Sequence, residues 1–358
     1  MMYQKFVKPL FFMMDPESAH KFILYLGRFL SWTKMSRILR PFFVFHDESL
    51  ENEVLGVNFE NPVGLAGGFD KNGYLTDFFP DIGFGFMEVG SVTANSYGGN
   101  PAPRLYRLLK NKGLVVNYGL ANQGVEVIHN RLKNRKFRIP VFVNVAKTND
   151  ASIKGDNSVK DYVMGFAKMR ALTDIFVINI SCPNAGDGRS FEDPVLLEKL
   201  LIALNKKRKG VKILLKISPD VEKNNLDKII FLAEKYHIDG FVISNLTKKR
   251  EGLIKEKGLE LKGGVSGQIL AKKSNKLIAY VFRKTRGRFV IMGCGGISSG
   301  KDAYEKIKSG ASLVELITGM IYQGPGLIKK INRELAELLE RDGYSNIKEA
   351  IGVSVRGG

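Results

Sequence analysis

Eight short apolar runs rich in β-branched residues recur after residue 60, and most are separated by stretches of helical periodicity such as 195–209 and 302–308. Runs of this kind are typical of strands that are buried on both faces in parallel βα units. Eight units in about 300 residues predict a (β/α)8 TIM barrel of the α/β class, with a doubly wound open sheet as the alternative. The runs lie at 63–67, 85–90, 140–145, 174–180, 212–217, 240–244, 289–293 and 312–317.

The first 45 residues have a different pattern, so we expect a helical extension over residues 1–45 and a barrel domain over residues 46–358. Asp15 and Pro16 suit the N-cap and first position of a helix, and apolar residues then recur at steps of three and four from Ala19 to Leu30. Basic residues flank this stripe. An amphipathic helical pair of this kind either packs on the main domain or lies at a membrane interface, and the pattern alone favours neither.

The chain carries 55 Lys and Arg against 36 Asp and Glu, a net charge of +19 that favours anionic partners. Residues 201–290 alone hold 22 basic and 8 acidic residues, or +14. Solvated helix faces are our first interpretation of this excess, and an anionic lipid surface is the second. Nucleic acid comes third, because no nucleic-acid motif accompanies the charge. No uncharged apolar run approaches membrane-spanning length, and we expect no signal peptide.

Polar residues and glycines follow the ends of the predicted strands, where a barrel carries its chemistry. Asn offers a donor and an acceptor that match amide or imide edges, while Lys71 and Lys216 suit a carboxylate or negative charge on a reduced ring. Lys216 ends an apolar run, which argues against an ordinary surface cation. We therefore expect a site for a flat, polar, anionic ligand, formed by residues 67–73, Asn144, Lys147, 179–184, Lys216, 244–245 and 293–296.

The turn at residues 293–300 is rich in glycine, follows the seventh predicted strand and opens a helix. Glycines let backbone N–H groups approach an anion, and a helix N-terminus favours negative charge. Residues 263–267 are suited to closing over the same site. The position of the turn late in a barrel predicts a phosphate seat, whereas a dinucleotide site is the weaker alternative because the spacing is G-x-G-G.

Cys182 is the best candidate for a catalytic base or nucleophile. It lies in a strand-end loop before Pro183, and a positive neighbourhood would raise its thiolate fraction. The alternative is a small buried cysteine, which is also our interpretation of Cys294. Two cysteines and four dispersed histidines form neither a disulfide framework nor a metal-ligand pattern, so we expect a reducing compartment and no metal.

These stretches, in this order, resemble dihydroorotate dehydrogenase, the flavin enzyme family of pyrimidine synthesis, over nearly the whole chain. The match rests on residues 61–71, 103–107, 179–184, 263–267 and 293–297, and residues 15–20 resemble the membrane-associated, quinone-using class (class 2). The resemblance implies FMN-dependent oxidation of dihydroorotate to orotate, with electrons passed to a membrane quinone. It also implies a peripheral position on an anionic surface, at the cytoplasmic side of the cell inner membrane, and no nucleic-acid partner.

The resemblance also assigns roles to individual residues. Cys182 falls on the base that removes the C5 proton of dihydroorotate while C6 delivers hydride to the flavin, and His20 and Arg107 fall near the quinone. Substrate contacts fall on Lys71, Asn117, Asn179, Asn184 and Asn245. FMN contacts fall on Gly67, Gly68, Lys71, Ser91, Asn144, Asn179, Lys216, Ser244, Gly267, Gly296, Ile317 and Thr318.

Several positions depart from the pattern of the quinone class. That class has Ser where Cys182 stands, and a Thr or Ser where Leu246 stands. A substrate-contacting Asn falls near Val116, with Asn117 one place away, and the loop at residues 185–189 also differs. Each lost polar contact to a buried substrate costs about 1–3 kcal/mol.

The departures motivate a second hypothesis, a soluble-type or drifted flavin oxidoreductase that uses fumarate or another acceptor, or acts on a related ring. The +14 segment motivates a third, a non-catalytic basic protein that binds lipid or nucleic acid.

Overall fold

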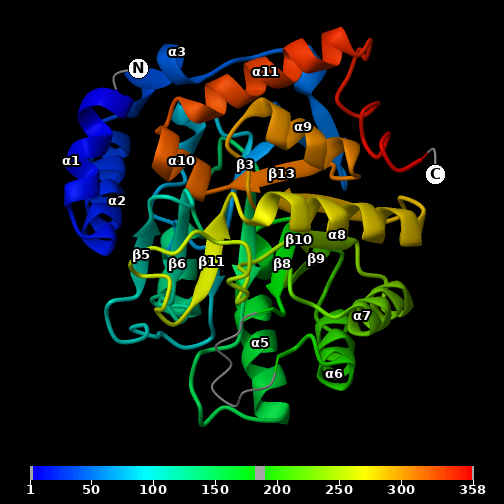
Figure 1. Cartoon of the computed structure of the whole chain (residues 1–358). Coiled ribbons are helices and arrows are strands. Elements are labelled where there is room, and N and C mark those ends of the chain that lie inside the picture. Colours follow the sequence, from blue (N-terminus) through cyan, green and yellow to red (C-terminus); the bar gives the residue numbers. More distant parts are fainter. Residues whose placement is uncertain (1–2, 182–189, 357–358) are drawn as a thin grey trace.

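The centre of the molecule is a closed barrel of eight parallel strands, seen in a computed structural model that describes residues 3–181 and 190–356 (Figure 1). Pairing of the last barrel strand with the first closes the ring. The predicted TIM barrel is therefore confirmed, and each of the eight apolar runs contributes one strand. These strands are β3 (Val63–Leu65), β4 (Phe86–Val92), β7 (Val141–Val145), β8 (Ile175–Asn179), β9 (Lys212–Ile217), β10 (Gly240–Ile243), β12 (Val290–Cys294) and β13 (Leu313–Leu316).

The amino end of the barrel is filled by apolar side chains. Phe86, Phe142 and Leu214 belong to a buried cluster inside the ring. The antiparallel hairpin β1 (Asn52–Val54) and β2 (Val57–Phe59) closes this end, because the ring of Phe59 lies 5.6 Å from that of Phe86 and 6.1 Å from that of Phe142. A packed amino end leaves the carboxyl end of the strands for ligands.

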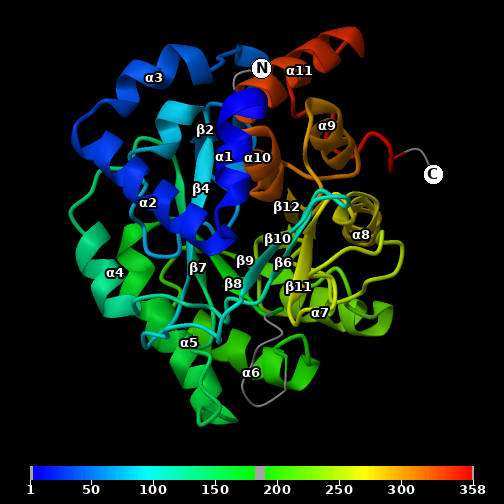
Figure 2. The same cartoon turned by 60° about the vertical axis from the view of Figure 1, so that its left-hand side comes forward.

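Helices surround the barrel and cover the outward faces of its strands (Figures 1 and 2). The helices expected at 195–209 and 302–308 are present with shifted bounds, the first beginning at Pro194 after the N-cap Asp193 and the second at Gly300 after the N-cap Ser299. Around the ring lie α4 (Val125–Leu132), α5 (Asp156–Met169), α6 (Pro194–Asn205), α7 (Lys223–Lys235), α8 (Leu270–Thr285), α9 (Gly300–Lys308), α10 (Thr318–Gln323) and α11 (Leu327–Arg341), with 3-10 turns η2 (Glu48–Leu50), η3 (Phe79–Ile82) and η4 (Arg170–Leu172).

A second, antiparallel sheet of three strands lies outside the barrel. It is formed by β5 (Leu105–Leu108), β6 (Gly113–Val116) and β11 (Gly264–Gly267), with β6 in the middle. The stretch at 263–267, expected to close over the site, thus forms an edge strand that pairs Gly264 with Val116.

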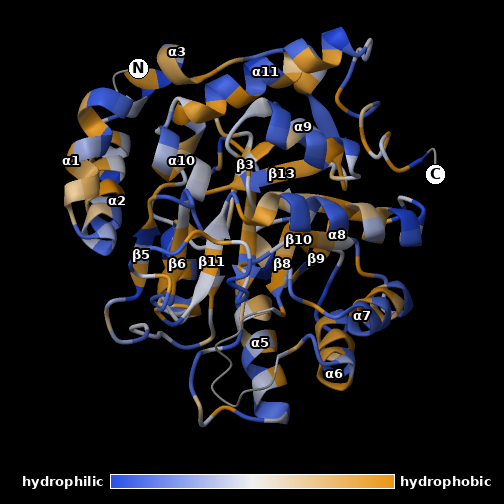
Figure 3. Cartoon of the chain, viewed as in Figure 1, coloured by the Kyte–Doolittle hydropathy of each residue, from blue (hydrophilic) through white to orange (hydrophobic). Residues whose placement is uncertain are grey.

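The N-terminal extension contains more helices than the expected pair. A π-helical turn η1 (Tyr3–Val7) runs into α1 (Lys8–Met13), which is followed by α2 (Pro16–Trp32) and α3 (Ser36–Phe43). Asp15 is the N-cap of α2, since its carboxylate accepts the N–H of Ser18 at 2.9 Å. Figure 3 shows apolar colours on the barrel strands and also on the outer helices α1 and α2.

Candidate active site

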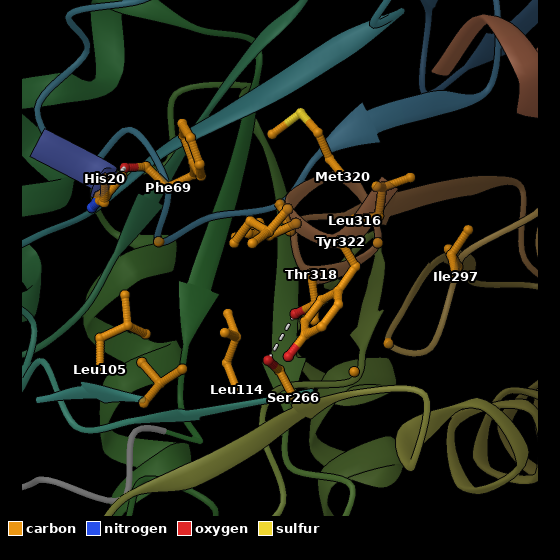
Figure 4. A pocket seen from close by; sticks show the side chains of 18 of the residues that line it. His20, Phe69, Leu105, Leu114, Ser266, Ile297, Leu316, Thr318, Met320 and Tyr322 are labelled. Carbon is orange, nitrogen blue, oxygen red and sulfur yellow. Dashed lines mark hydrogen bonds between the residues drawn. The ribbon is translucent and has the colours of Figure 1, made fainter. Parts of the chain in front are cut away.

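A cavity of about 1080 Å³ opens at the carboxyl ends of the barrel strands. It extends to the three-stranded sheet and the N-terminal helices, and Figure 4 shows His20 of α2, Leu114 of β6 and Tyr322 of α10 around it. The barrel strands contribute mainly polar groups, whereas α1 and α2 contribute apolar side chains such as Phe11 and Ile23. The cavity therefore joins a polar inner region to an apolar outer region, as in many ligand sites.

Lys216 forms the floor of the polar region, and two buried glutamates lie behind it. Lys216 of β9 lines the cavity, and its Nζ lies 2.8 Å from Glu315 Oε1 of β13 and 3.4 Å from Glu88 Oε2 of β4. The side chain of Lys216 is 5% exposed, and both glutamates are 0% exposed. Burial opposes the charge of Lys216, but its interactions with Glu315 and Glu88 outweigh burial and raise its pKa, so the ammonium persists.

A chain of hydrogen bonds connects this floor to the wall of the cavity. Asn144 Nδ2 donates to Glu88 Oε2 at 2.8 Å, and Ser91 Oγ donates to Asn144 Oδ1 at 2.5 Å. Asn179 Nδ2 donates to Ser91 Oγ at 3.2 Å, and Asn245 Nδ2 donates to Asn179 Oδ1 at 3.3 Å. Closure of the barrel brings these groups together from separate strands, and their mutual bonds fix how the amides are oriented.

A second lysine lies nearer to the N-terminal helices. Lys71 Nζ is 4.0 Å from the centre of the Tyr118 ring, and loss of water lowers its pKa to about 8 although Asp70 attracts the charge. His20 Nε2 donates to the carbonyl of Phe69 at 2.9 Å, while the Tyr118 hydroxyl lies 3.4 Å from His20 Nδ1. Burial, assisted by Lys71, lowers the pKa of His20 to about 3, so its imidazole is neutral at physiological pH.

The glycine turn after β12 reaches the cavity as expected. Gly295 and Gly296 line it with φ values of 103° and 78°, a backbone conformation that other residues rarely adopt. Asp302, in the first turn of α9, accepts the N–H of Ser298 at 2.9 Å. The start of α9 thus already has a carboxylate of its own, so the glycine amides are the better candidates for an external anion.

The family model of dihydroorotate dehydrogenase matches residues 49–339 of the chain. The chain belongs to the dihydroorotate dehydrogenase family.

Relatives within the family match almost the whole chain. A protein from Christiangramia forsetii named dihydroorotate dehydrogenase (quinone) is 39% identical over 341 residues, which cover 94% of this chain and 99% of the relative. A protein of the same name from Trichodesmium erythraeum is 36% identical over 359 residues, covering 95% and 94% of the two chains. The crystal structure of DHODH in complex with ferulenol from Eimeria tenella has a TM-score of 0.84 at 30% identity and covers 96% of both chains. The family is generally flavin-dependent.

The structure brings most of the residues predicted from the family resemblance into this one cavity. Among the predicted FMN contacts, Asn144 is the one that does not line the cavity, because it lies behind Ser91 and bonds to it. The predicted quinone residues His20 and Arg107 both line the cavity. Lys147, named as a rim residue, instead donates to backbone carbonyls of its own loop, including that of Ile153 at 3.0 Å.

Three of the predicted substrate residues line the cavity, one does not, and one, with the predicted base Cys182, lies outside the described residues. Lys71, Asn179 and Asn245 line the cavity. Asn117 does not, since its side-chain oxygen accepts a hydrogen bond from Asn100 at 3.0 Å. Cys182 and Asn184 lie outside the described residues.

Three residues of the site were missed by sequence reasoning, namely Glu88, Glu315 and Tyr118. A signal was available for the two glutamates, because each is an acidic residue inside an otherwise apolar strand run. Tyr118 carried no such signal, since its place beside Lys71 depends on how the segment after β6 folds back.

Proposed function

We propose that FMN is the flavin of this enzyme, that residues 46–358 form its catalytic barrel, and that residues 1–45 hold it on an anionic membrane surface. The enzyme oxidises dihydroorotate to orotate in pyrimidine biosynthesis and passes the electrons to a quinone. The observation that carries the proposal is the cavity that joins the polar strand ends to the apolar N-terminal helices.

The strand-end residues fit a flavin mononucleotide. Ser244 Oγ is buried and has no hydrogen-bond partner among the described residues, so it is available to a ligand. Gly68 lines the cavity with open space where a Cβ would stand, which leaves room for a ring. The amides of Gly295 and Gly296 suit a phosphate, and the ammonium of Lys216 suits negative charge on the ring. A bound flavin supplies the acceptor for substrate hydride and the donor for the quinone.

The polar wall suits dihydroorotate. The ammonium of Lys71 attracts a carboxylate, and the side-chain amides of Asn179 and Asn245 match the donors and acceptors of an imide ring. In this proposal Cys182 removes the C5 proton, and Asn184 adds a further contact to the same ring. Cys182 needs its thiolate form for this role, and a positive neighbourhood would favour that form.

Val116 and Leu246 make the remaining wall less polar than the family pattern implies, since both line the cavity. Asn117, which follows Val116 in the chain, stays in the proposed substrate set, although its side chain bonds to Asn100 instead of lining the cavity. The soluble-type alternative with fumarate is not favoured, because relatives that match nearly the whole chain carry the name of the quinone enzyme.

The region between the barrel and the N-terminal helices suits an uncharged quinone. Its lining includes the neutral imidazole of His20 and the apolar rings of Phe11 and Phe12. Arg107 donates to the carbonyls of Met14 at 2.8 Å and Phe11 at 3.0 Å, so it holds the turn between α1 and α2 over the cavity. The quinone would therefore reach the flavin between these helices and β5.

Exposed apolar side chains support a peripheral membrane position, on the cytoplasmic side of the cell inner membrane. In the part of the chain that the structure describes, no helix has the length and apolarity to cross a membrane. Instead, the N-terminal helices from η1 to α3 expose large apolar groups beside basic residues, as interfacial helices do. The most exposed of these groups are Phe6, Leu10, Met13, Tyr25, Trp32, Ile38 and Phe42.

The cofactor proposal is tested by denaturing the purified protein and identifying what it releases. We expect a yellow compound with the mass of FMN, bound about one per chain. Release of FAD, or a colourless protein that takes up no added FMN, would refute the assignment.

The membrane proposal is tested by sedimentation with vesicles of phosphatidylglycerol or phosphatidylcholine. We expect the protein to pellet with the anionic vesicles, and the double variant Trp32→Ser with Ile38→Ser to lose most of this binding. Phe231→Ser on α7 is the matched control, because Phe231 is 62% exposed far from the N-terminal helices. Equal loss in the control would show that the binding surface lies elsewhere.

A further inference from the structure

Three strands of the barrel bring one cation and two carboxyl groups together in its interior. Lys216, Glu88 and Glu315 come from β9, β4 and β13, which are not neighbours in the ring. If both glutamates were ionised, the group would carry a net negative charge although both carboxyl groups are 0% exposed. A buried excess charge of this kind is expensive, so a proton is normally taken up instead.

The hydrogen bonds of the two glutamates are strongly unequal. Glu88 Oε2 accepts from three donors: the N–H of Gly67 at 3.1 Å, the amide of Asn144 at 2.8 Å and the ammonium of Lys216 at 3.4 Å. Glu315 Oε1 accepts from Lys216 at 2.8 Å. The second oxygen of each group, Glu88 Oε1 and Glu315 Oε2, is buried with no partner among the described residues. The two carboxyl groups lie within hydrogen-bonding reach of each other, so a shared proton would satisfy them.

We propose that Glu315 is a neutral carboxylic acid in the native enzyme, that it donates its proton to Glu88, and that the acid pair positions the Lys216 ammonium under the ring site. Glu88 is the ionised member, because three donors already stabilise its charge. The group is then neutral overall, with one ammonium, one carboxylate and one carboxylic acid. Glu315 acts through Lys216 and Glu88 and is a positioning residue.

The surrounding charges favour this assignment. Burial, followed by repulsion from Glu88, raises the pKa of Glu315 to about 8, although Lys216 opposes the shift. On β12, the Cys294 thiol faces Glu315, and burial raises the pKa of that thiol, so it stays neutral. Lys306 of α9 lies behind Cys294, donates to Asn275 at 2.8 Å, and has a pKa lowered by burial to about 8. Lys306 keeps most of its charge at neutral pH, but Lys216 is the cation that bonds to Glu315.

The effect of the acid pair on the flavin rests on the proposed function, whereas the protonation of Glu315 does not. Below about pH 8 the acid pair leaves the full charge of Lys216 available to a ring that gains negative charge. Above that pH, loss of the proton leaves a second carboxylate beneath the ring and opposes reduction. The proton itself resides in the protein whether or not a flavin is bound.

The direct test uses flavin-free protein and the isosteric variant Glu315→Gln, whose amide can still donate to Glu88 and accept from Lys216. In an infrared pH titration, the wild type should show a carboxylic acid band that disappears as the pH passes about 8. The difference between wild type and variant isolates this band from other buried acids. Presence of the same band in Glu315→Gln, or no difference between the proteins near neutral pH, would overturn the proposal.

Thermal stability of the same flavin-free proteins gives an independent readout. The folded wild type holds a proton that the unfolded chain releases above about pH 4.5, so its stability should fall as the pH rises from about 4.5 to about 8. Glu315→Gln lacks this proton and should gain in melting temperature relative to the wild type across that window. Glu305→Gln, on the exposed face of α9, is the matched control and should follow the wild type. A variant that is less stable than the wild type by the same amount at every pH would show that Glu315 is ionised.

With the flavin reconstituted, the midpoint potential should fall more steeply with pH above about 8 in the wild type than in Glu315→Gln. Parallel curves would contradict the link from the acid pair to the ring. Failure to bind flavin at all would count against the proposed function but would leave the infrared and stability results to decide the inference.

Discussion

At the scale of single residues, the cavity changes how ordinary side chains ionise. Lys71 is the clearest case, since its ammonium lies in an enclosed site beside the Tyr118 ring and its pKa falls to about 8. A lysine that titrates here binds a carboxylate at neutral pH and loses that ability slightly above it. This gives the proposed substrate site its own pH dependence.

We expect the dissociation constant of orotate, followed through the flavin absorbance, to be constant below about pH 8 and to rise by about tenfold per pH unit above it. The reason is that the neutral amine of Lys71 no longer attracts the carboxylate. Lys71→Met should bind orotate weakly with no inflection, whereas Lys160→Met, on the exposed surface of α5, should behave as the wild type. An unchanged inflection in Lys71→Met would assign it to another group.

Leu246 provides a second prediction at this scale. It lines the cavity next to Asn245, where a hydroxyl would meet a polar ring. Because one hydrogen bond contributes about 0.5–1.5 kcal/mol, Leu246→Thr should lower the KM for dihydroorotate about 2- to 10-fold with little change in kcat. Val195→Thr, on the exposed face of α6, is the control. An unchanged KM in Leu246→Thr would mean that the substrate does not reach this wall.

Residues of the site could be predicted from the sequence where motifs of Gly, Asn and Lys follow strand ends. Glu88 and Glu315 could not be assigned to the site in this way, although each interrupts an apolar run. Their meaning appears only when closure of the ring brings β4, β9 and β13 to a common centre with Lys216.

At the scale of elements, the N-terminal helices are tied to the barrel at defined points. Arg104, just before β5, donates to both carboxylate oxygens of Glu17 on α2, at 2.8 and 2.6 Å. Tyr3 donates to the carbonyl of Ile321 at 2.7 Å and anchors the first turn on α10. These contacts keep the helices over the cavity mouth while their outer faces remain exposed.

We therefore expect Glu17→Gln to loosen α2, with faster hydrogen exchange over residues 16–32 and a loss of about 1–3 kcal/mol in local stability. The hydrogen bond from Arg104 holds the pKa of Glu17 at about 2. The stabilisation is thus present above about pH 4.5 and is lost as the pH falls toward 2. Glu126→Gln, which removes an exposed pair with Lys168, should leave exchange in α2 unchanged. Equal protection of α2 in Glu17→Gln and wild type would show that packing alone holds the helix.

The barrel strands could be predicted because they are apolar on both faces. The sheet of β5, β6 and β11 could not, because its strands have four residues each and the middle one pairs with a segment far along the chain. The helix start at Asp15 was predicted, but the number of N-terminal helices was missed, since α3 has only eight residues and contains Pro41.

At the scale of the whole molecule, the apolar helices and the basic excess lie on different flanks. Figure 1 shows α1 and α2 on one side and α7 and α8, from the +14 segment, on the other. Several of those basic residues pair with acids at the surface, among them Lys235 with Glu198 and Arg288 with Glu234. The excess therefore fits solvated helix faces, and the proposed membrane contact depends on the N-terminal helices.

The most direct test of the whole scheme is anaerobic mixing of the flavin-loaded enzyme with dihydroorotate, with flavin absorbance followed over time. We predict bleaching by dihydroorotate, then recovery of the oxidised spectrum on addition of a quinone analogue and no recovery with fumarate. Absence of bleaching, or recovery with fumarate alone, would contradict the assignment of substrate and acceptor.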